Sequence, residues 1–302
     1  MQGEGLISAG ARIARNNKRY VVWFFLLNLA FARLGASGLG AQASATLDHS
    51  FYADRLLHGF NLAVLNELIV RPEFGPARGA TAPAMIFAVL FFVVSLIFMP
   101  GVLLGYSSDH RISRDEFFRT CGHNLWRFVR LFLFFIVIAG IIASILSGIE
   151  FALAKAANET SNERLPFYMH LASLVIMFLV LTTIRIWFDL AETEVVLRDQ
   201  GATRKSVASG FRTTWHNLKR LLGSYVGIAL VALLILVAGI VLWHSIVPPA
   251  SVFGAFLISQ ATLLLLLAAR FWQRATVVAF YLGKWTSIEE TKPASTALVS
   301  AS

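Results

Sequence analysis

Charged residues are scarce in this chain, and their scarcity decides its class. Asp, Glu, Lys and Arg make up 14% of the 302 residues, whereas soluble proteins carry roughly 25%. Hydrophobic residues reach 57%, including 25 Phe, and the mean hydropathy is +0.69. Such a composition leaves too few charges to cover a soluble surface, so much of the surface must face lipid. The sequence therefore predicts an integral membrane protein.

Cysteine and catalytic motifs are nearly absent as well. Cys121 is the only cysteine, which excludes an intramolecular disulfide framework and a multi-cysteine zinc site. The sequence also lacks the Walker loop, the HExxH string and the GxSxG string. We therefore expect no enzymatic activity, no cofactor and no metal site. Basic residues outnumber acidic ones by 26 to 17, but in a membrane protein this excess does not indicate a nucleic-acid partner.

Six hydrophobic stretches are candidates for membrane spans. A spanning helix needs about 20 mostly apolar residues, and five stretches approach or exceed that length, namely 84–106, 131–151, 167–188, 221–244 and 252–269. The first stretch, 20–34, contains Arg33 and precedes the small-residue run ASGLGAQASA, which resembles a signal-peptidase site. It is either a cleaved signal peptide or a retained helix. We favour retention because Arg33 can extend its side chain to the interface.

The distribution of basic residues orients the predicted spans. Short cytoplasmic loops carry an excess of Lys and Arg. Here the basic residues concentrate in segment 1–19, between the second and third spans, and between the fourth and fifth. We therefore expect both termini in the cytoplasm, a six-span membrane domain over 20–283, an outer loop over 40–83, and a disordered cytoplasmic tail over 284–302.

The two basic connections contain nearly the same string. Residues 118–127 read FRTCGHNLWR and residues 211–220 read FRTTWHNLKR, so seven of ten positions match at an offset of 93 residues. The same offset superimposes the third span on the fifth. This period predicts a duplicated unit of several helices with both copies in one orientation, which is a parallel repeat. Convergence of two interfacial segments on similar residues is the alternative.

Each copy has the pattern of an amphipathic helix lying in the interface plane, over about 113–127 and 204–220. Residues four apart share a helix face, and each copy carries one basic stripe. We expect the stripes to contact anionic lipid headgroups; their residues are Arg119, His123, Arg127, Arg212, His216 and Arg220. The apolar stripes contain Phe117, Cys121 and Phe128 in the first copy and Phe211 and Trp215 in the second.

The basic segments RDEFFRTCGHNLWRFVRLFLFF and VLRDQGATRKSVASGFRTTWHNLKRLLGSYV lead directly into spans. In this layout the chain resembles a group of uncharacterised bacterial six-span proteins. It is more distantly similar to the membrane domain that accompanies some glycerophosphodiester phosphodiesterases. The likeness covers most of residues 19–283, and it implies a six-span helical fold in the inner membrane of a bacterium. It implies no catalytic residues, because that membrane domain is not the catalytic part.

Charged residues near the ends of two spans form the second candidate site. Ionisable groups in spans are costly and mark functional or pairing positions. Arg185 and Asp189 near the end of the fourth span correspond to Arg270 and Arg274 in the sixth. Asp189, Glu192 and Glu194 can pair with these arginines across helices, which would orient the two spans. Headgroup contact and a substrate or ion pathway are the alternatives.

Small residues suggest where spans touch. Gly140 and Gly148 in the third span and Gly223 and Gly227 in the fifth recur four or eight apart, a spacing that lets helix backbones approach closely. The leading functional hypothesis is a non-enzymatic membrane protein that holds anionic lipid or a protein partner at the cytoplasmic leaflet. A small transporter or lipid translocator at the repeat axis is the alternative, and a membrane-embedded hydrolase is a third.

Overall fold

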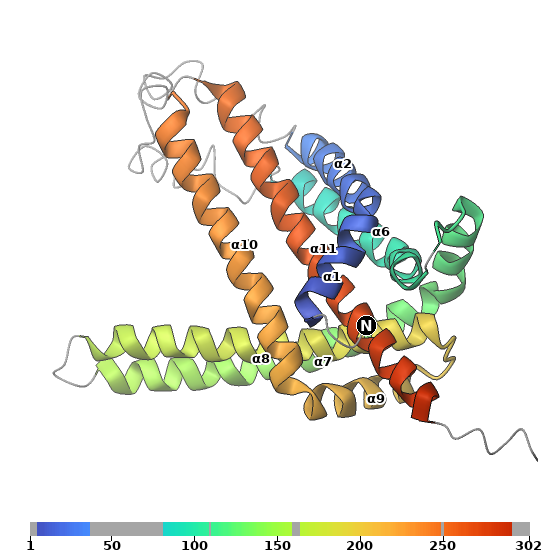
Figure 1. The fold of residues 1–302 in the computed structure, drawn as a ribbon. Coiled ribbons are helices and arrows are strands. Elements are labelled where there is room, and N and C mark those ends of the chain that lie inside the picture. The colour runs from blue at the N-terminus through green and yellow to red at the C-terminus, as the bar shows by residue number, and fades with distance from the viewer. Residues whose placement is uncertain (1–4, 37–80, 109, 159–163, 249–250, 292–302) are drawn as a thin grey trace, which may run out of the picture. The chain divides into compact units, whose positions relative to one another are not determined.

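The computed structural model describes residues 5–36, 81–108, 110–158, 164–248 and 251–291. Within these ranges every regular element is an α-helix (Figure 1), which confirms the predicted all-α class. The predicted outer loop lies outside the described residues except for residues 81–83. The helices in chain order are α1 (Leu6–Asn16), α2 (Lys18–Gly35), α6 (Thr81–Ser107), α7 (Arg114–Asn158), α8 (Leu165–Leu197), α9 (Thr203–His216), α10 (Leu218–Ile246) and α11 (Val252–Thr291).

Five described helices, α6, α7, α8, α10 and α11, are long and apolar enough to cross a membrane. In the most apolar 18-residue stretch of each helix, only 6% to 28% is buried inside the protein. Apolar helix surface that the protein leaves uncovered fits contact with lipid, and helices satisfy their own backbone hydrogen bonds there. The chain is therefore indicated to be a multi-pass membrane protein. Helix α2 has only 18 residues and includes Lys18, Arg19 and Arg33, so the sixth span stays a prediction.

The two basic segments fold differently. Helix α7 runs without a break through the first segment into the span, although the sequence predicted a separate helix over 113–127. Ser113 caps its start, because the Glu116 backbone N–H donates to Ser113 Oγ at 3.2 Å. In the second segment α9 ends at His216 and α10 begins at Leu218, so the helix predicted over 204–220 is interrupted at Asn217.

The chain divides into two compact units. The first unit comprises residues 1–16, 97–228 and 272–302, and the second comprises residues 17–96 and 229–271. Within the second unit, Phe24 contacts Phe271 with ring centroids 5.1 Å apart, and Phe31 contacts Phe87 at 6.0 Å. Aromatic packing therefore joins α2 to parts of α11 and α6 in that unit.

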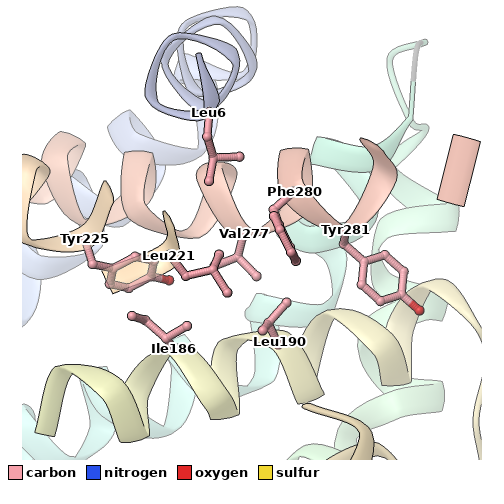
Figure 2. Packing of buried hydrophobic residues seen from close by; sticks show 8 residues of the cluster. All are labelled: Leu6, Ile186, Leu190, Leu221, Tyr225, Val277, Phe280 and Tyr281. Atoms are coloured by element: carbon pink, nitrogen blue, oxygen red, sulfur yellow. The ribbon is translucent and has the colours of Figure 1, made fainter. Parts of the chain in front are cut away.

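The first unit contains a well-packed apolar core (Figure 2). Helices α1, α8, α10 and α11 contribute its buried residues, which are Leu6, Ile186, Leu190, Leu221, Tyr225, Val277, Phe280 and Tyr281. The sequence predicts only a basic terminus over segment 1–19, whereas the structure has helix α1 there. The few apolar residues of α1 lie among basic ones, so the segment has no long apolar run. Helix α11 also continues to Thr291, into the segment predicted to be a disordered tail.

Helix α1 packs closely against α11 within the first unit. The Trp272 indole N–H donates to the Ile7 carbonyl at 2.9 Å. Gly10 is buried, and a Cβ atom added there would lie 2.8 Å from the Thr276 Cα. Only a residue without a side chain allows this approach. By contrast, a Cβ at Gly140, Gly148 or Gly223 would meet nothing within 4 Å, so the predicted contact through these glycines is wrong.

Candidate functional site

Helices α8 and α11 bring four charged side chains together beside the apolar core of the first unit. The Arg274 guanidinium lies 2.8 Å from Glu192 Oε2 and 3.8 Å from Asp189 Oδ1. Arg185 Nε lies 3.7 Å from Asp189 Oδ2. From α10, the Tyr225 hydroxyl donates to Asp189 Oδ2 at 2.6 Å. We call Arg185, Asp189, Glu192, Tyr225 and Arg274 the polar cluster.

The polar cluster pairs its charges internally. The Asp189 side chain is 6% exposed and that of Arg274 is 15% exposed. Removing charges from water is costly, and the cost is offset only when each charge has a close partner and further hydrogen bonds. Two carboxylates face two guanidinium groups here, and Tyr225 supplies a hydrogen bond. The arrangement fixes α8, α10 and α11 relative to one another within the first unit.

Sequence reasoning found most of this cluster. It named Arg185, Asp189 and Arg274, and expected Glu192 as a partner, and the structure brings these residues together. Arg270, the fourth named residue, is exposed. Tyr225 was missed because it lies on a third helix, and its neighbours in the sequence gave no signal of a buried hydrogen bond.

The first basic stripe is held by a loop of the protein itself. His123 Nε2 lies 2.9 Å from Asp199 Oδ1, and the Arg127 guanidinium pairs with the same oxygen. Asp199 follows the end of α8 and has φ = 50°, a left-handed conformation that Asp and Asn tolerate better than most residues. Hydrogen bonds from Arg127 and His123 lower the pKa of Asp199 below its ordinary value of 3.8. His123 and Arg127 were predicted to contact lipid headgroups, but in the structure both bind this carboxylate.

The second basic stripe lies on α9 and the start of α10, and its side chains are exposed. Arg212, His216 and Arg220 all face outward, and the Arg220 guanidinium also lies 5.9 Å from the Phe280 ring centroid. Beside them, the Phe211 and Trp215 rings stack with centroids 5.9 Å apart and are 47% and 64% exposed. We call Phe211, Arg212, Trp215 and His216 the α9 surface.

The buried face of α9 consists of small residues. Thr203, Ser206, Gly210 and Thr214 are buried, and the Trp187 indole of α8 donates to the Val207 carbonyl at 2.6 Å. A Cβ at Gly210 would lie 3.0 Å from the Trp187 carbonyl oxygen. Helix α9 therefore lies close to α8 through small side chains. Its aromatic residues stay at the edge of this contact, where one side of Phe211 meets Trp187 with ring centroids 5.0 Å apart and Trp215 is exposed.

The apolar stripes predicted for the two copies differ in exposure because they do not occupy matched positions. Phe117, Cys121 and Phe128 of the first copy are buried, whereas Phe211 and Trp215 of the second are exposed. At the offset of 93 residues Phe211 matches Phe118, which is also exposed. Arg119, on α7, is exposed. The predicted headgroup residues therefore separate into His123 and Arg127, which bind Asp199, and four exposed ones, Arg119, Arg212, His216 and Arg220.

Within the described ranges, no three His, Cys, Asp or Glu side chains are grouped so that they could hold a metal ion. Comparison of the chain with models of protein families, with curated proteins and with solved structures gave no match.

Proposed function

We propose that this chain is a six-span protein of the bacterial inner membrane that holds anionic phospholipid at the cytoplasmic leaflet. In this proposal both termini are cytoplasmic, α2 is the first span, and the protein has no enzymatic activity. The α9 surface and the start of α10 make the lipid contact. From the sequence, the basic stripes of both copies of the repeat were expected to contact lipid headgroups. The proposal assigns this contact to the second copy.

The observation that carries the proposal is the inverted surface of α9. A helix on the surface of a soluble protein normally buries its aromatic residues and exposes small polar ones. Helix α9 instead buries Thr203, Ser206 and Gly210 and exposes Phe211 and Trp215. Tryptophan and basic residues together are typical of helices at the membrane interface, where the ring enters the headgroup region and the cation meets phosphate.

The charge around α9 supports an anionic partner. Arg204, Lys205, Arg212, Lys219 and Arg220 are exposed on α9 and the first turn of α10, and this stretch has no acidic residue between Asp199 and the span. Each basic residue near an anionic membrane surface contributes about 1 kcal/mol of attraction. Several together favour anionic over neutral lipid.

The test compares two variants with the same loss of charge. Arg212→Gln/Lys219→Gln removes two exposed cations beside Trp215, whereas Lys155→Gln/Arg164→Gln removes two cations from the predicted outer side. At about 1 kcal/mol for each charge, the first variant should bind phosphatidylglycerol roughly 30-fold more weakly. Lipid retained after mild-detergent purification, measured by mass spectrometry, gives the comparison. Equal lipid retention in both variants, with both proteins folded, would contradict the proposal.

Transport at the repeat axis has less support. A transporter is expected to place polar or charged groups along a path at mid-depth. The apolar segments of α7 and α10 carry no charged residue between Arg130 and Glu150 or between Arg220 and His244. The buried charges of α8 and α11 pair with one another in the polar cluster. The charge distribution therefore favours lipid contact at one surface over passage through the bundle.

A further inference from the structure

Helix α7 carries a second surface with the composition of a membrane interface. Trp126 is 61% exposed, and the Arg130 guanidinium lies over its ring, 5.2 Å from the centroid. Arg119 is exposed as well. Residues three or four apart share one side of a helix, and five such residues follow one another along α7. We call them the α7 surface: Arg119, His123, Trp126, Arg127 and Arg130.

An anionic oxygen of the protein itself already occupies this surface. Asp199, in the loop between α8 and α9, places its Oδ1 atom 2.9 Å from His123 Nε2. The same oxygen accepts a hydrogen bond from Arg127 Nη1. The Asp199 side chain is 69% exposed, so other anions have access to the position that it fills. The carboxylate thus marks a point on the α7 surface where two donors converge on one anion.

We propose that the α7 surface is a second binding site for the phosphate of an anionic phospholipid, and that Asp199 occupies this site as an internal competitor. Carboxylate and phosphate oxygens accept the same charge-assisted hydrogen bonds from Arg and protonated His. Asp199 is tethered beside its partners and therefore competes at a high effective concentration. The exposed Trp126 and Arg130 beside this point are the residue types that helices place in the headgroup region.

Asp199 acts on only one of the two matched strings. At the offset of 93 residues Asp199 matches Tyr106, so the first copy has no carboxylate at the equivalent position. Within the described residues, no carboxylate pairs with Arg212 or His216 of the α9 surface. Asp199 therefore directs lipid to the α9 surface and keeps it from the α7 surface. This inference rests on the proposed function for the class of lipid.

The test looks for a gain of binding, which differs from the loss that a damaged fold would cause. Asp199→Asn removes the competing charge, and Asn tolerates the left-handed conformation at φ = 50°. Two double variants have the same net charge as each other. Asp199→Asn/Arg127→Gln removes a donor of the α7 surface. Asp199→Asn/Arg114→Gln removes an exposed arginine that lies five residues before Arg119, about 140° around the helix.

The probes are dioctanoyl phosphatidylglycerol and inorganic phosphate, titrated separately by calorimetry into the purified full-length protein in mild detergent. We expect Asp199→Asn to bind phosphatidylglycerol about fivefold more tightly, which is the effect of one basic residue made available to an anionic lipid. Asp199→Asn/Arg114→Gln should keep this gain, and Asp199→Asn/Arg127→Gln should lose it. A gain for inorganic phosphate without a gain for the lipid would overturn the lipid as the ligand.

Three further outcomes decide between this inference and the proposed function. If Asp199→Asn binds lipid like the unmodified protein while Arg212→Gln/Lys219→Gln loses lipid, the α7 site is wrong and the proposed function stands. If Arg212→Gln/Lys219→Gln retains lipid while Asp199→Asn shows a gain that Arg127→Gln cancels, the α7 site is supported and the α9 surface is wrong. A gain that both double variants lose equally is a general effect of charge and overturns the inference.

Thermal unfolding in detergent verifies that each variant folds. Asp199 is exposed and lies outside the apolar core, so Asp199→Asn leaves the core residues in place. Asp199→Gly also suits the left-handed conformation, and it gives the answer if Asp199→Asn does not fold.

Discussion

Asp199 joins the loop after α8 to helix α7 through one exposed carboxylate. Asp199 Oδ1 contacts both the His123 imidazole and the Arg127 guanidinium. We expect Asp199→Asn to loosen this contact without disturbing the backbone, because Asn also tolerates a left-handed conformation. Arg127→Gln should then cost less in the Asp199→Asn background, where only its hydrogen bond to Asn124 Oδ1 remains to be lost, than it costs alone. A double-mutant cycle of thermal unfolding measures this coupling, and additive effects of the two changes would contradict it.

The lowered pKa of Asp199 gives this contact a pH dependence. A carboxylate whose pKa is lower in the folded state stabilises the fold above its ordinary pKa, and this contribution is lost as the pH falls through the folded value. The stability difference between the protein and its Asp199→Asn variant should therefore shrink below pH 3.8. Using the His123→Gln background for both proteins removes the titration of the imidazole. A difference that stays constant down to pH 2 would contradict the prediction.

Arg274 balances two carboxylates in the polar cluster. Replacing it with Leu leaves Asp189 and Glu192 close together without their shared guanidinium, and breaking a buried pair costs about 3–5 kcal/mol. Arg274→Leu should therefore unfold at markedly lower temperature in detergent. Arg270→Gln changes an exposed arginine one turn earlier on the same helix and is the control. Equal stability of the two variants would show that the cluster contributes little.

At the scale of helices, replacing Gly10 or Gly223 with alanine compares a tightly packed helix position with an open one. Gly10 allows α1 to approach α11, and a methyl group there would press on the Thr276 backbone. Gly10→Ala should destabilise this packing by about 1–3 kcal/mol. Gly223 is exposed in α10 with open space around it, so Gly223→Ala should be neutral or stabilising by up to about 1 kcal/mol. Hydrogen exchange of residues 6–16 should rise only in the first variant.

The length and apolar composition of single helices were predictable, but their surroundings were not. The apolar stretches 84–106, 131–151 and 221–244 each lie within one helix of the structure. The matched strings at 118–127 and 211–220, however, fold as a continuous helix in one case and as two helices separated by Asn217 in the other. Sequence similarity predicted the same role for both. Packing partners elsewhere in the chain made the two segments different.

At the scale of the whole chain, the topology can be tested directly. Basic residues concentrate in alternate connections, so reporter tags at Gly3 and Ser302 should both give cytoplasmic signals. A tag near Gly79 should report the outer side. A C-terminal tag on the outer side would contradict the six-span arrangement, and N-terminal sequencing of the purified protein would show whether the first span is retained.

The sequence by itself determined the class of this protein and the position of its apolar helices. These properties depend on composition and on runs of neighbouring residues, because a spanning helix needs about 20 consecutive apolar residues. It also named four of the five residues in the polar cluster, because charges near spans are few. Only the tertiary structure decided that Asp199 binds the first basic stripe, that Tyr225 completes the cluster, and that the second stripe stays exposed. The contacts of Tyr225 and Asp199 join residues 36 to 76 positions apart, and a local pattern carries no information about which distant side chains meet.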